Sequence, residues 1–166
     1  MTPRFLGEFE VMLDEKNRLP IPAAIRKKLE PEKAMYLVFV KKWPWLYPLS
    51  YYDKLMESFQ PSLEPTEEEM AFIHKHGSMA SIVEWDNQGR ILIPELTLRR
   101  CEGLGRELTL VGGINRLEIW NRQAWNTRWT SLLDKGTGNS EAKALNFEPQ
   151  GIVVPHFQPP TERVER

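Results

Sequence analysis

Apolar and polar side chains alternate along residues 5–13, the first element that the chain predicts. Phe9, Val11 and Leu13 recur at every second position, a period that is typical of a strand with one buried face. Runs of apolar, β-branched and aromatic residues predict further strands, at 18–22, 35–40, 46–47, 90–94, 107–111 and 117–120. Short strands in this number indicate a protein that consists mainly of β-structure.

Helical spacing of apolar residues appears between these strands. The segments 23–29 and 95–101 each follow a proline and are predicted to form about two turns of helix. Longer amphipathic helices are predicted at 48–59 and 121–133. In the last of these, four large side chains lie on one face, which favours a core or subunit contact over a platform for stacked bases: Trp125, Trp129, Leu132 and Leu133.

The segment between the two halves of the chain contains a hinge and one more helix. Pro61 and Pro65 mark the hinge, and Thr66 is the predicted N-cap of the helix that follows. His74 and His76 lie near its end. Two positions apart on a helix, they point in different directions and make a poor metal pair, so we expect surface or capping histidines.

One polar turn occurs twice in the chain. The segment Asp14-Glu-Lys-Asn-Arg-Leu-Pro-Ile-Pro22 is repeated 72 positions later as Asp86-Asn-Gln-Gly-Arg-Ile-Leu-Ile-Pro94. Because basic residues and aromatic residues also recur downstream of both copies, the chain is predicted to contain a duplicated module. Gly89 occupies the position of Asn17, and both residue types adopt a positive φ readily. We therefore expect a left-handed residue before each arginine.

The overall charge hides a separation of charges along the chain. The 166 residues have a formal net charge of −1, which excludes a uniformly basic nucleic-acid binder. Residues 16–28 nevertheless contain five basic and no acidic side chains, and residues 57–69 contain five acidic and no basic ones. A local basic patch is sufficient to meet phosphates. The alternative is a solvated helix face, and the second basic pair at Arg99 and Arg100 argues against it.

The remaining composition and motifs exclude several classes of function. No apolar segment approaches the roughly 20 residues needed to span a bilayer, no secretory signal is recognisable, and Cys101 is the single cysteine, so we expect a cytoplasmic protein. No glycine-rich phosphate loop, metal-ligand spacing or nucleophile motif is present, so we expect neither an enzyme nor a cofactor. An Asp beside an Arg is held ionised and is poorly suited to proton transfer. An exposed Arg suits phosphate and guanine contacts.

Six segments in order resemble the MraZ family of bacterial transcriptional regulators: Phe5–Phe9, Leu13–Ala23, Leu46–Pro48, Asp86–Pro94, Leu110–Gly112 and Arg116–Trp120. The resemblance implies an α+β, mostly β fold, in which two tandem SpoVT-AbrB modules interleave as swapped hairpins into a split β-barrel with flanking helices. We expect module 1 at 8–52, a linker and helix at 53–79, module 2 at 80–125, the end of the C-terminal helix at 126–134 and a mobile tail at 135–166.

The resemblance also implies a function. Members of the family are cytoplasmic, nucleoid-associated DNA-binding proteins that form ring-shaped homo-oligomers, bind short promoter repeats and usually repress their own division and cell-wall gene cluster. The family's DNA contacts map here to Asp14, Lys16, Arg18, Asp86, Gln88 and Arg90, and we expect phosphate attraction from Arg26, Lys27, Arg99 and Arg100.

Two segments depart from the family pattern. Asn17 replaces the usual glycine of the first turn, and Lys41-Lys-Trp-Pro-Trp45 replaces a glycine-containing turn, so the first hairpin is expected to differ in shape.

Two other functions remain open at this stage. A scaffold of the same fold that sequesters a partner protein would use the six tryptophans as contact residues. An antitoxin of the same fold superfamily usually has one module and a toxin-wrapping tail. Salt dependence distinguishes DNA binding from an apolar protein interface.

Overall fold

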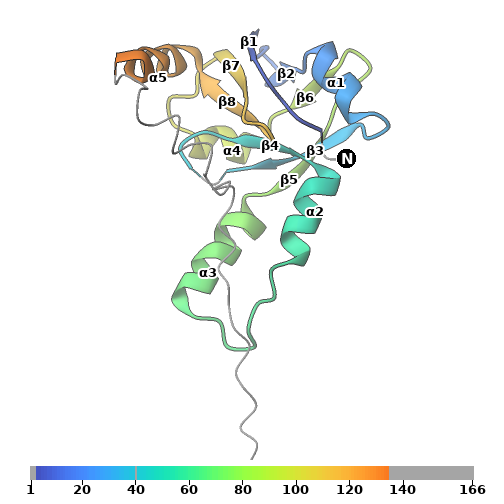
Figure 1. The fold of residues 1–166 in the computed structure, drawn as a ribbon, viewed down its shortest axis with the longest axis vertical. Coiled ribbons are helices and arrows are strands. Elements are labelled where there is room, and N and C mark those ends of the chain that lie inside the picture. Colours follow the sequence, from blue (N-terminus) through green and yellow to red (C-terminus); the bar gives the residue numbers. More distant parts are fainter. Residues whose placement is uncertain (1–2, 40, 135–166) are drawn as a thin grey trace, which may run out of the picture.

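The structure is a computed structural model that describes residues 3–39 and 41–134 of the chain (Figure 1). The first half contains β1 (Glu8–Met12), β2 (Arg18–Pro20), α1 (Ala23–Leu29), β3 (Ala34–Val38), β4 (Trp45–Pro48), α2 (Leu49–Glu57) and α3 (Glu67–Ile73). It is followed by a π-helical turn η1 (His74–Ser78), β5 (Ser81–Glu84), β6 (Arg90–Leu92), α4 (Glu95–Arg100), β7 (Glu107–Gly112), β8 (Leu117–Asn121) and α5 (Arg122–Asp134). The predicted elements are present and differ mainly at their ends, whereas β5 was not predicted.

The strands of the two halves exchange partners. Six strands form one antiparallel sheet in the order β1-β7-β8-β4-β3-β5, and β2 pairs with β6 in a second sheet. Strand β1 thus joins the hairpin β7–β8 of the other half, and β5 joins the hairpin β3–β4. This confirms the predicted α+β fold of two interleaved repeats. Among the described residues the pairings give two sheets, linked by a bridge between Trp85 and Ile91, and no closed ring of strands.

The larger of two core clusters in the described part of the chain draws on both halves, and the smaller contains Val38, Trp45, Tyr47 and Tyr52. Strand β1 alternates between exposed and half-buried residues, as its sequence predicts. The residues of β2 and β6 at the centre of the pairing, Leu19 and Ile91, face each other and are fully buried. The sequence repeats at 8–52 and 80–125 are therefore not separately packed units. Strand β2 pairs with β6 alone, in agreement with the presence of Pro20.

Helices α2 and α3 form an arm that extends away from the sheet (Figure 1). At its far end Thr66 caps α3 through a capping box, because its hydroxyl accepts from the N–H of Glu69 at 3.2 Å and the Glu69 carboxylate accepts from the N–H of Thr66 at 2.6 Å. The rings of Phe59 and Phe72 pack with centroids 4.6 Å apart and hold the two sides of the arm together. The predicted N-cap is confirmed.

His76 is buried, so the prediction of a surface or capping histidine is wrong for it. The turn η1 places the ring against Phe72, with centroids 4.2 Å apart, and puts Nδ1 at 3.3 Å from the hydroxyl of Tyr52. Burial lowers the pKa of His76 to about 4, so the ring is neutral at pH 7 and shares a hydrogen bond with the hydroxyl of Tyr52. His74 is exposed, as expected.

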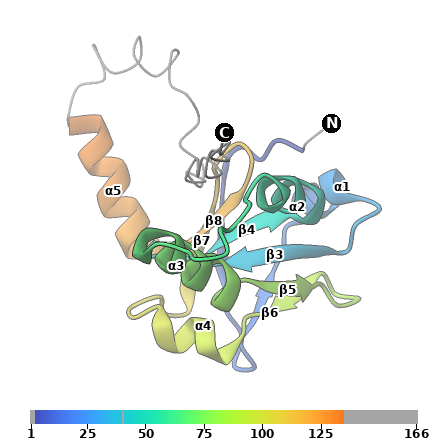
Figure 2. The ribbon, with the colours of Figure 1, turned by 90° about the horizontal axis from the view of Figure 1, so that it is seen from below.

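Helix α5 has no buried residue and extends away from the sheets (Figure 2). Trp125 attaches the first turns of α5 to β1, because the indole N–H of Trp125 donates to Oε2 of Glu8 at 2.7 Å. Trp129, Leu132 and Leu133 are 51%, 41% and 63% exposed. A core role for this apolar face is therefore wrong for these three residues, and a subunit contact stays a prediction.

The sequence analysis predicted a mobile tail at residues 135–166. These residues lie outside the part of the chain that the structure describes. Within the described ranges, every helix falls short of the length and apolar character that crossing a bilayer requires.

The buried His76 predicts that stability depends on pH. Its pKa is about 4 in the folded protein and 6.5 as the reference for the unfolded chain, so its contribution is complete above pH 6.5 and is lost as pH falls toward 4. We expect the free energy of unfolding to decrease by roughly 1 to 3 kcal/mol over this range. Urea unfolding at pH 7, 6 and 5 measures it. His76→Gln should flatten the pH dependence, and the exposed His74→Gln should not; equal slopes in both variants would contradict the assignment.

Candidate nucleic-acid interface

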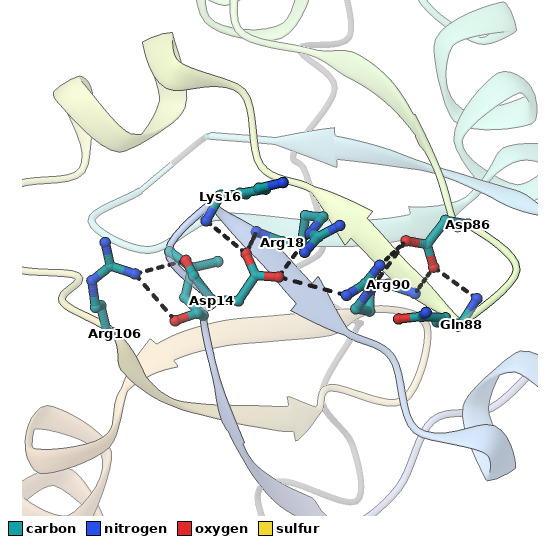
Figure 3. Close-up of polar contacts among 8 residues, drawn as sticks. Asp14, Lys16, Arg18, Asp86, Gln88, Arg90 and Arg106 are labelled. Carbon is teal, nitrogen blue, oxygen red and sulfur yellow. Dashed lines mark hydrogen bonds and ion pairs between the residues drawn. The ribbon is translucent and has the colours of Figure 1, made fainter.

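The two repeated turns have the same internal hydrogen bonds. In the first, Oδ1 of Asp14 accepts from the backbone N–H groups of Lys16 and Arg18, both at 2.9 Å. In the second, Oδ1 of Asp86 accepts from Gln88 at 2.9 Å and from Arg90 at 3.0 Å (Figure 3). An aspartate that accepts from N–H groups two and four residues ahead nucleates a tight turn. The acidic residue is thus part of the turn's architecture in both copies.

Each turn contains one residue in the left-handed region, as the repeat predicts. Asn17 has φ +59° and Gly89 has φ +77°. At Gly89 a second constraint applies, since an added Cβ would lie 2.5 Å from Cζ of Arg26. The Nε of Arg26 donates to the carbonyl of Ile21 at 3.1 Å, which holds its guanidinium over the second turn. A basic side chain from the first half therefore covers the turn of the second.

The pairing of β2 with β6 places the two turns next to each other. Beyond the strands, the N–H of Ile21 donates to the carbonyl of Gly89 at 2.8 Å, and the N–H of Ile93 donates to that of Asn17 at 2.9 Å. The end of each strand is therefore bonded to the turn of the other half. The result is an approximate two-fold arrangement in which the two arginines lie between the two aspartates (Figure 3).

Ion pairs link the turns to each other. Nε of Arg18 lies 2.7 Å from Oδ2 of Asp14, and Nη2 of Arg90 lies 2.8 Å from Oδ2 of Asp86. Arg90 also reaches across, with Nη1 at 3.7 Å from Oδ2 of Asp14. The side chains of Arg18 and Arg90 remain 32% and 23% exposed. Both guanidinium groups are therefore held in place and still accessible from solvent.

The pKa values of both aspartates are lowered by these contacts. Hydrogen bonds from the side chain and the backbone N–H of Arg90 lower the pKa of Asp86 to about 2. For Asp14, the hydrogen bond from the backbone N–H of Arg18 is the largest cause of a lowered pKa. Both carboxylates are ionised at neutral pH, which suits a positioning role for the arginines.

Arg106 belongs to the same surface and was missed by the sequence prediction. Its Nη1 donates to the carbonyl of Asp14 at 2.6 Å and to that of Leu13 at 3.4 Å, so an exposed guanidinium flanks the first turn (Figure 3). The carbonyl of Arg106 also accepts from the N–H of Leu13 at 2.9 Å. In the other half, the carbonyl of Lys33 accepts from the N–H of Trp85 at 3.2 Å, so Lys33 corresponds to Arg106. This repeat of basic residues before β3 and β7 was the available signal.

The remaining predicted residues are exposed cations or polar groups. Lys16 and Gln88 are exposed at the turn tips. Lys27 lies in the last turn of α1, and Arg99 and Arg100 lie in the last turn of α4, all three exposed. The structure thus brings the six turn residues and Arg26 together. Their DNA contacts, and those of the three helical cations, stay a prediction.

Across residues 3–39 and 41–134, no three His, Cys, Asp or Glu side chains gather where they could hold a metal ion. The chemistry that this surface offers is that of fixed cationic donors.

Comparison with protein families adds a match over most of the chain. A family model described as "MraZ protein, putative antitoxin-like" matches residues 4–72 and 78–147. Each matched segment contains one of the two turns, so the family pattern and the structural repeat coincide.

The constraint at Gly89 predicts a stability effect. Gly89→Ala places a Cβ in the left-handed conformation and displaces the flexible guanidinium of Arg26, and we expect it to cost about 1 to 2 kcal/mol, mainly through the backbone. Gly77→Ala is the matched control, because nothing lies within 4 Å of its Cβ position. Chemical unfolding of both variants checks this. An equal, small change in the two would show that the second turn tolerates a side chain.

Proposed function

Since the chain belongs to the MraZ family, we propose that it is a DNA-binding regulator of transcription whose paired turns contact duplex DNA. The observation that carries this proposal is the placement of Arg18 and Arg90 between Asp14 and Asp86 on one surface. A preorganised guanidinium loses little conformational freedom when it binds a phosphate or a guanine edge.

The two arginines have different roles in this proposal. Nε of Arg18 donates a hydrogen bond to Asp14. Both terminal nitrogens of the guanidinium then remain for a bidentate contact with guanine. Arg90 bonds Asp86 through Nε and Nη2 and approaches Asp14 through Nη1. We assign base reading mainly to Arg18. Arg90 holds the two turns together and adds positive charge.

The phosphate contacts are unequal at the two turns. The first turn has Lys16 and Arg106 at its tip and flank, whereas the second has Gln88 at the matching tip position. Lys33, which corresponds to Arg106, lies beside Glu30 and Glu32. The first turn therefore has two cations, Lys16 and Arg106, whereas the second has one, Arg26, whose guanidinium lies over Gly89. Lys27, Arg99 and Arg100 add long-range attraction from the helices.

Regulation follows from binding at the promoter. We propose that the chain acts in the cytoplasm at the nucleoid as a homo-oligomer, a ring in the form that its family resemblance suggests, and represses its own division and cell-wall gene cluster. When several turn pairs of one oligomer bind successive repeats, each bound pair raises the effective concentration of the next. The affinity then increases by a factor of about 10² to 10⁴ in favourable geometry. No enzymatic step belongs to this function.

A second candidate function is a protein-interaction scaffold. It is favoured by the exposed apolar residues Trp129, Leu132 and Leu133 on α5 and by the antitoxin-like description of the family. An apolar interface changes little with salt, whereas binding to several phosphates weakens steeply.

Arg18→Ala tests the base-reading role. We expect a loss of about 1 to 3 kcal/mol on the chain's own promoter repeats and a smaller loss on a scrambled duplex. Fluorescence anisotropy at two salt concentrations measures both. Lys27→Ala, which removes a cation from α1, should weaken the two duplexes equally. If Arg18→Ala does the same as Lys27→Ala, Arg18 is a phosphate contact. Equal, weak binding of the wild type to both duplexes would favour the scaffold.

Arg106→Ala tests the phosphate contact that the structure adds. We expect weaker binding to specific and scrambled DNA by the same factor, and a salt slope reduced by about one unit, because one counterion fewer is released. Lys75→Ala removes an exposed cation on η1, away from the turns, and should leave both affinities unchanged. Equal effects of the two substitutions would remove Arg106 from the interface.

A further inference from the structure

A groove of about 960 Å³ lies beside α5. Its walls come from the loop before β4, from β8 and from α5, and they combine aromatic, cationic and apolar side chains: Lys41, Lys42, Trp45, Trp120, Arg128 and Leu132. The paired turns do not line it. It is therefore a second surface feature that the proposed DNA contacts leave unused.

Cations lie over the tryptophans of this groove. Cζ of Arg116 is 4.0 Å from the ring centroid of Trp45, and Nζ of Lys42 is 5.1 Å from that of Trp43. Arg128 lies 5.6 Å from the ring of Trp120. Trp43 and Trp45 are each only 6% exposed, so their faces are not free to stack on a base. The accessible chemistry of the groove is that of its cationic head groups.

The groove has an excess of positive charge and a fixed wall. Lys41, Lys42, Arg116 and Arg128 face two acidic residues, and one of these, Glu118, is neutralised by Arg116 at 2.6 Å. The loop is held because the thiol of Cys101 donates to the carbonyl of Lys42 at 3.2 Å and the N–H of Ile119 donates to that of Pro44 at 2.9 Å. A preformed cationic groove fits an acidic segment with little ordering cost.

The arm of the same chain carries such a segment. Glu57, Glu64, Glu67 and Glu68 are exposed, and no basic residue occurs from 57 to 69. Leu63, next to Glu64, is fully exposed at the tip of the arm. Capping of α3 accounts for acidic residues in its first turn, but it gives no reason for an exposed leucine.

Hydrogen bonds hold the tip of the arm against α3. Both carboxylate oxygens of Glu69 accept from the hydroxyl of Ser62 at 2.7 Å, in addition to the capping box with Thr66. The loop that carries Leu63 and Glu64 is thereby tied back to α3. An exposed apolar side chain on a fixed, acidic projection has the form of an anchor residue for a pocket.

We propose that the groove receives the arm tip of a second copy of this chain. Glu64, Glu67 and Glu68 meet Lys41, Lys42 and Arg128, and Leu63 lies against Leu132. The arm and α5 leave the sheet in different directions (Figure 1), and the contact joins one copy's arm to its neighbour's groove. Such a heterologous contact continues from copy to copy and closes a ring when its rotation permits. The proposal rests on the assembly part of the proposed function.

Charge reversal tests this contact. Glu64→Lys/Glu67→Lys/Glu68→Lys reverses the arm, and Lys41→Glu/Lys42→Glu reverses the groove. Light scattering after size exclusion at low salt is expected to show an assembly for wild type and the 19.4 kDa monomer for each variant alone. An equimolar mixture of the two variants restores assembly, because each arm then meets a groove of opposite charge. A general loss of folding would not be rescued by mixing.

Glu30→Lys/Glu84→Lys/Glu95→Lys is the matched control, because it reverses three exposed acidic residues outside the arm and the groove. It should assemble like wild type. Wild-type mass in both reversed variants, monomeric wild type, or no rescue on mixing would each overturn the proposal. A photo-crosslinker in place of Leu63 is expected to label the 41–45 or 124–132 segment of another copy, and labelling confined to other segments would also overturn it.

The test separates assembly from DNA binding. The arm-reversed monomer should still bind a duplex with one repeat, Arg18→Ala in this variant should weaken that binding, and the monomer should lose the gain from tandem repeats. If DNA binding is absent while assembly follows the charge pattern, the regulator proposal fails and the contact stands.

Discussion

The short pairing of β2 with β6 is the constraint on which the functional surface depends. It spans three residue pairs, and its central pair joins Leu19 and Ile91, both fully buried in the common core. Burying two such side chains stabilises the pairing by several kcal/mol, on the order of 1.5 to 3 kcal/mol for each. Because each turn immediately precedes one of these strands, the core contact fixes the distance between two arginines that are far apart in sequence.

Local chemistry explains what the sequence predicted well. The bonds that form each turn run from an aspartate to N–H groups two and four residues ahead, so the residues that specify them are adjacent in the chain. The same holds for Asn17 and Gly89, whose backbone conformation follows from residue type, and for the capping box of Thr66. Repetition made the signals of the turns visible twice.

Long-range contacts explain what the sequence did not predict. Arg106 reaches Asp14 across 92 residues, and Arg26 covers Gly89 from the other half of the chain. Neighbouring residues predict neither contact, since both arise from strand exchange, and the signal for Arg106 was its correspondence to Lys33 in the other half. His76 is buried because Tyr52 supplies a partner for its ring nitrogen and Phe72 packs on its face. A polar residue type near a helix end gave no indication of that pocket.

The exchange of β1 and β5 between the halves has a consequence for how the protein is made. As the N-terminal half leaves the ribosome, β1 lacks its partner β7, which is translated about 100 residues later, and the hairpin β3–β4 lacks β5. Native pairing at such sequence separation is slow because a large loop must close first. The newly synthesised half-chain therefore has unpaired strand edges, and folding is completed only after β8 has emerged.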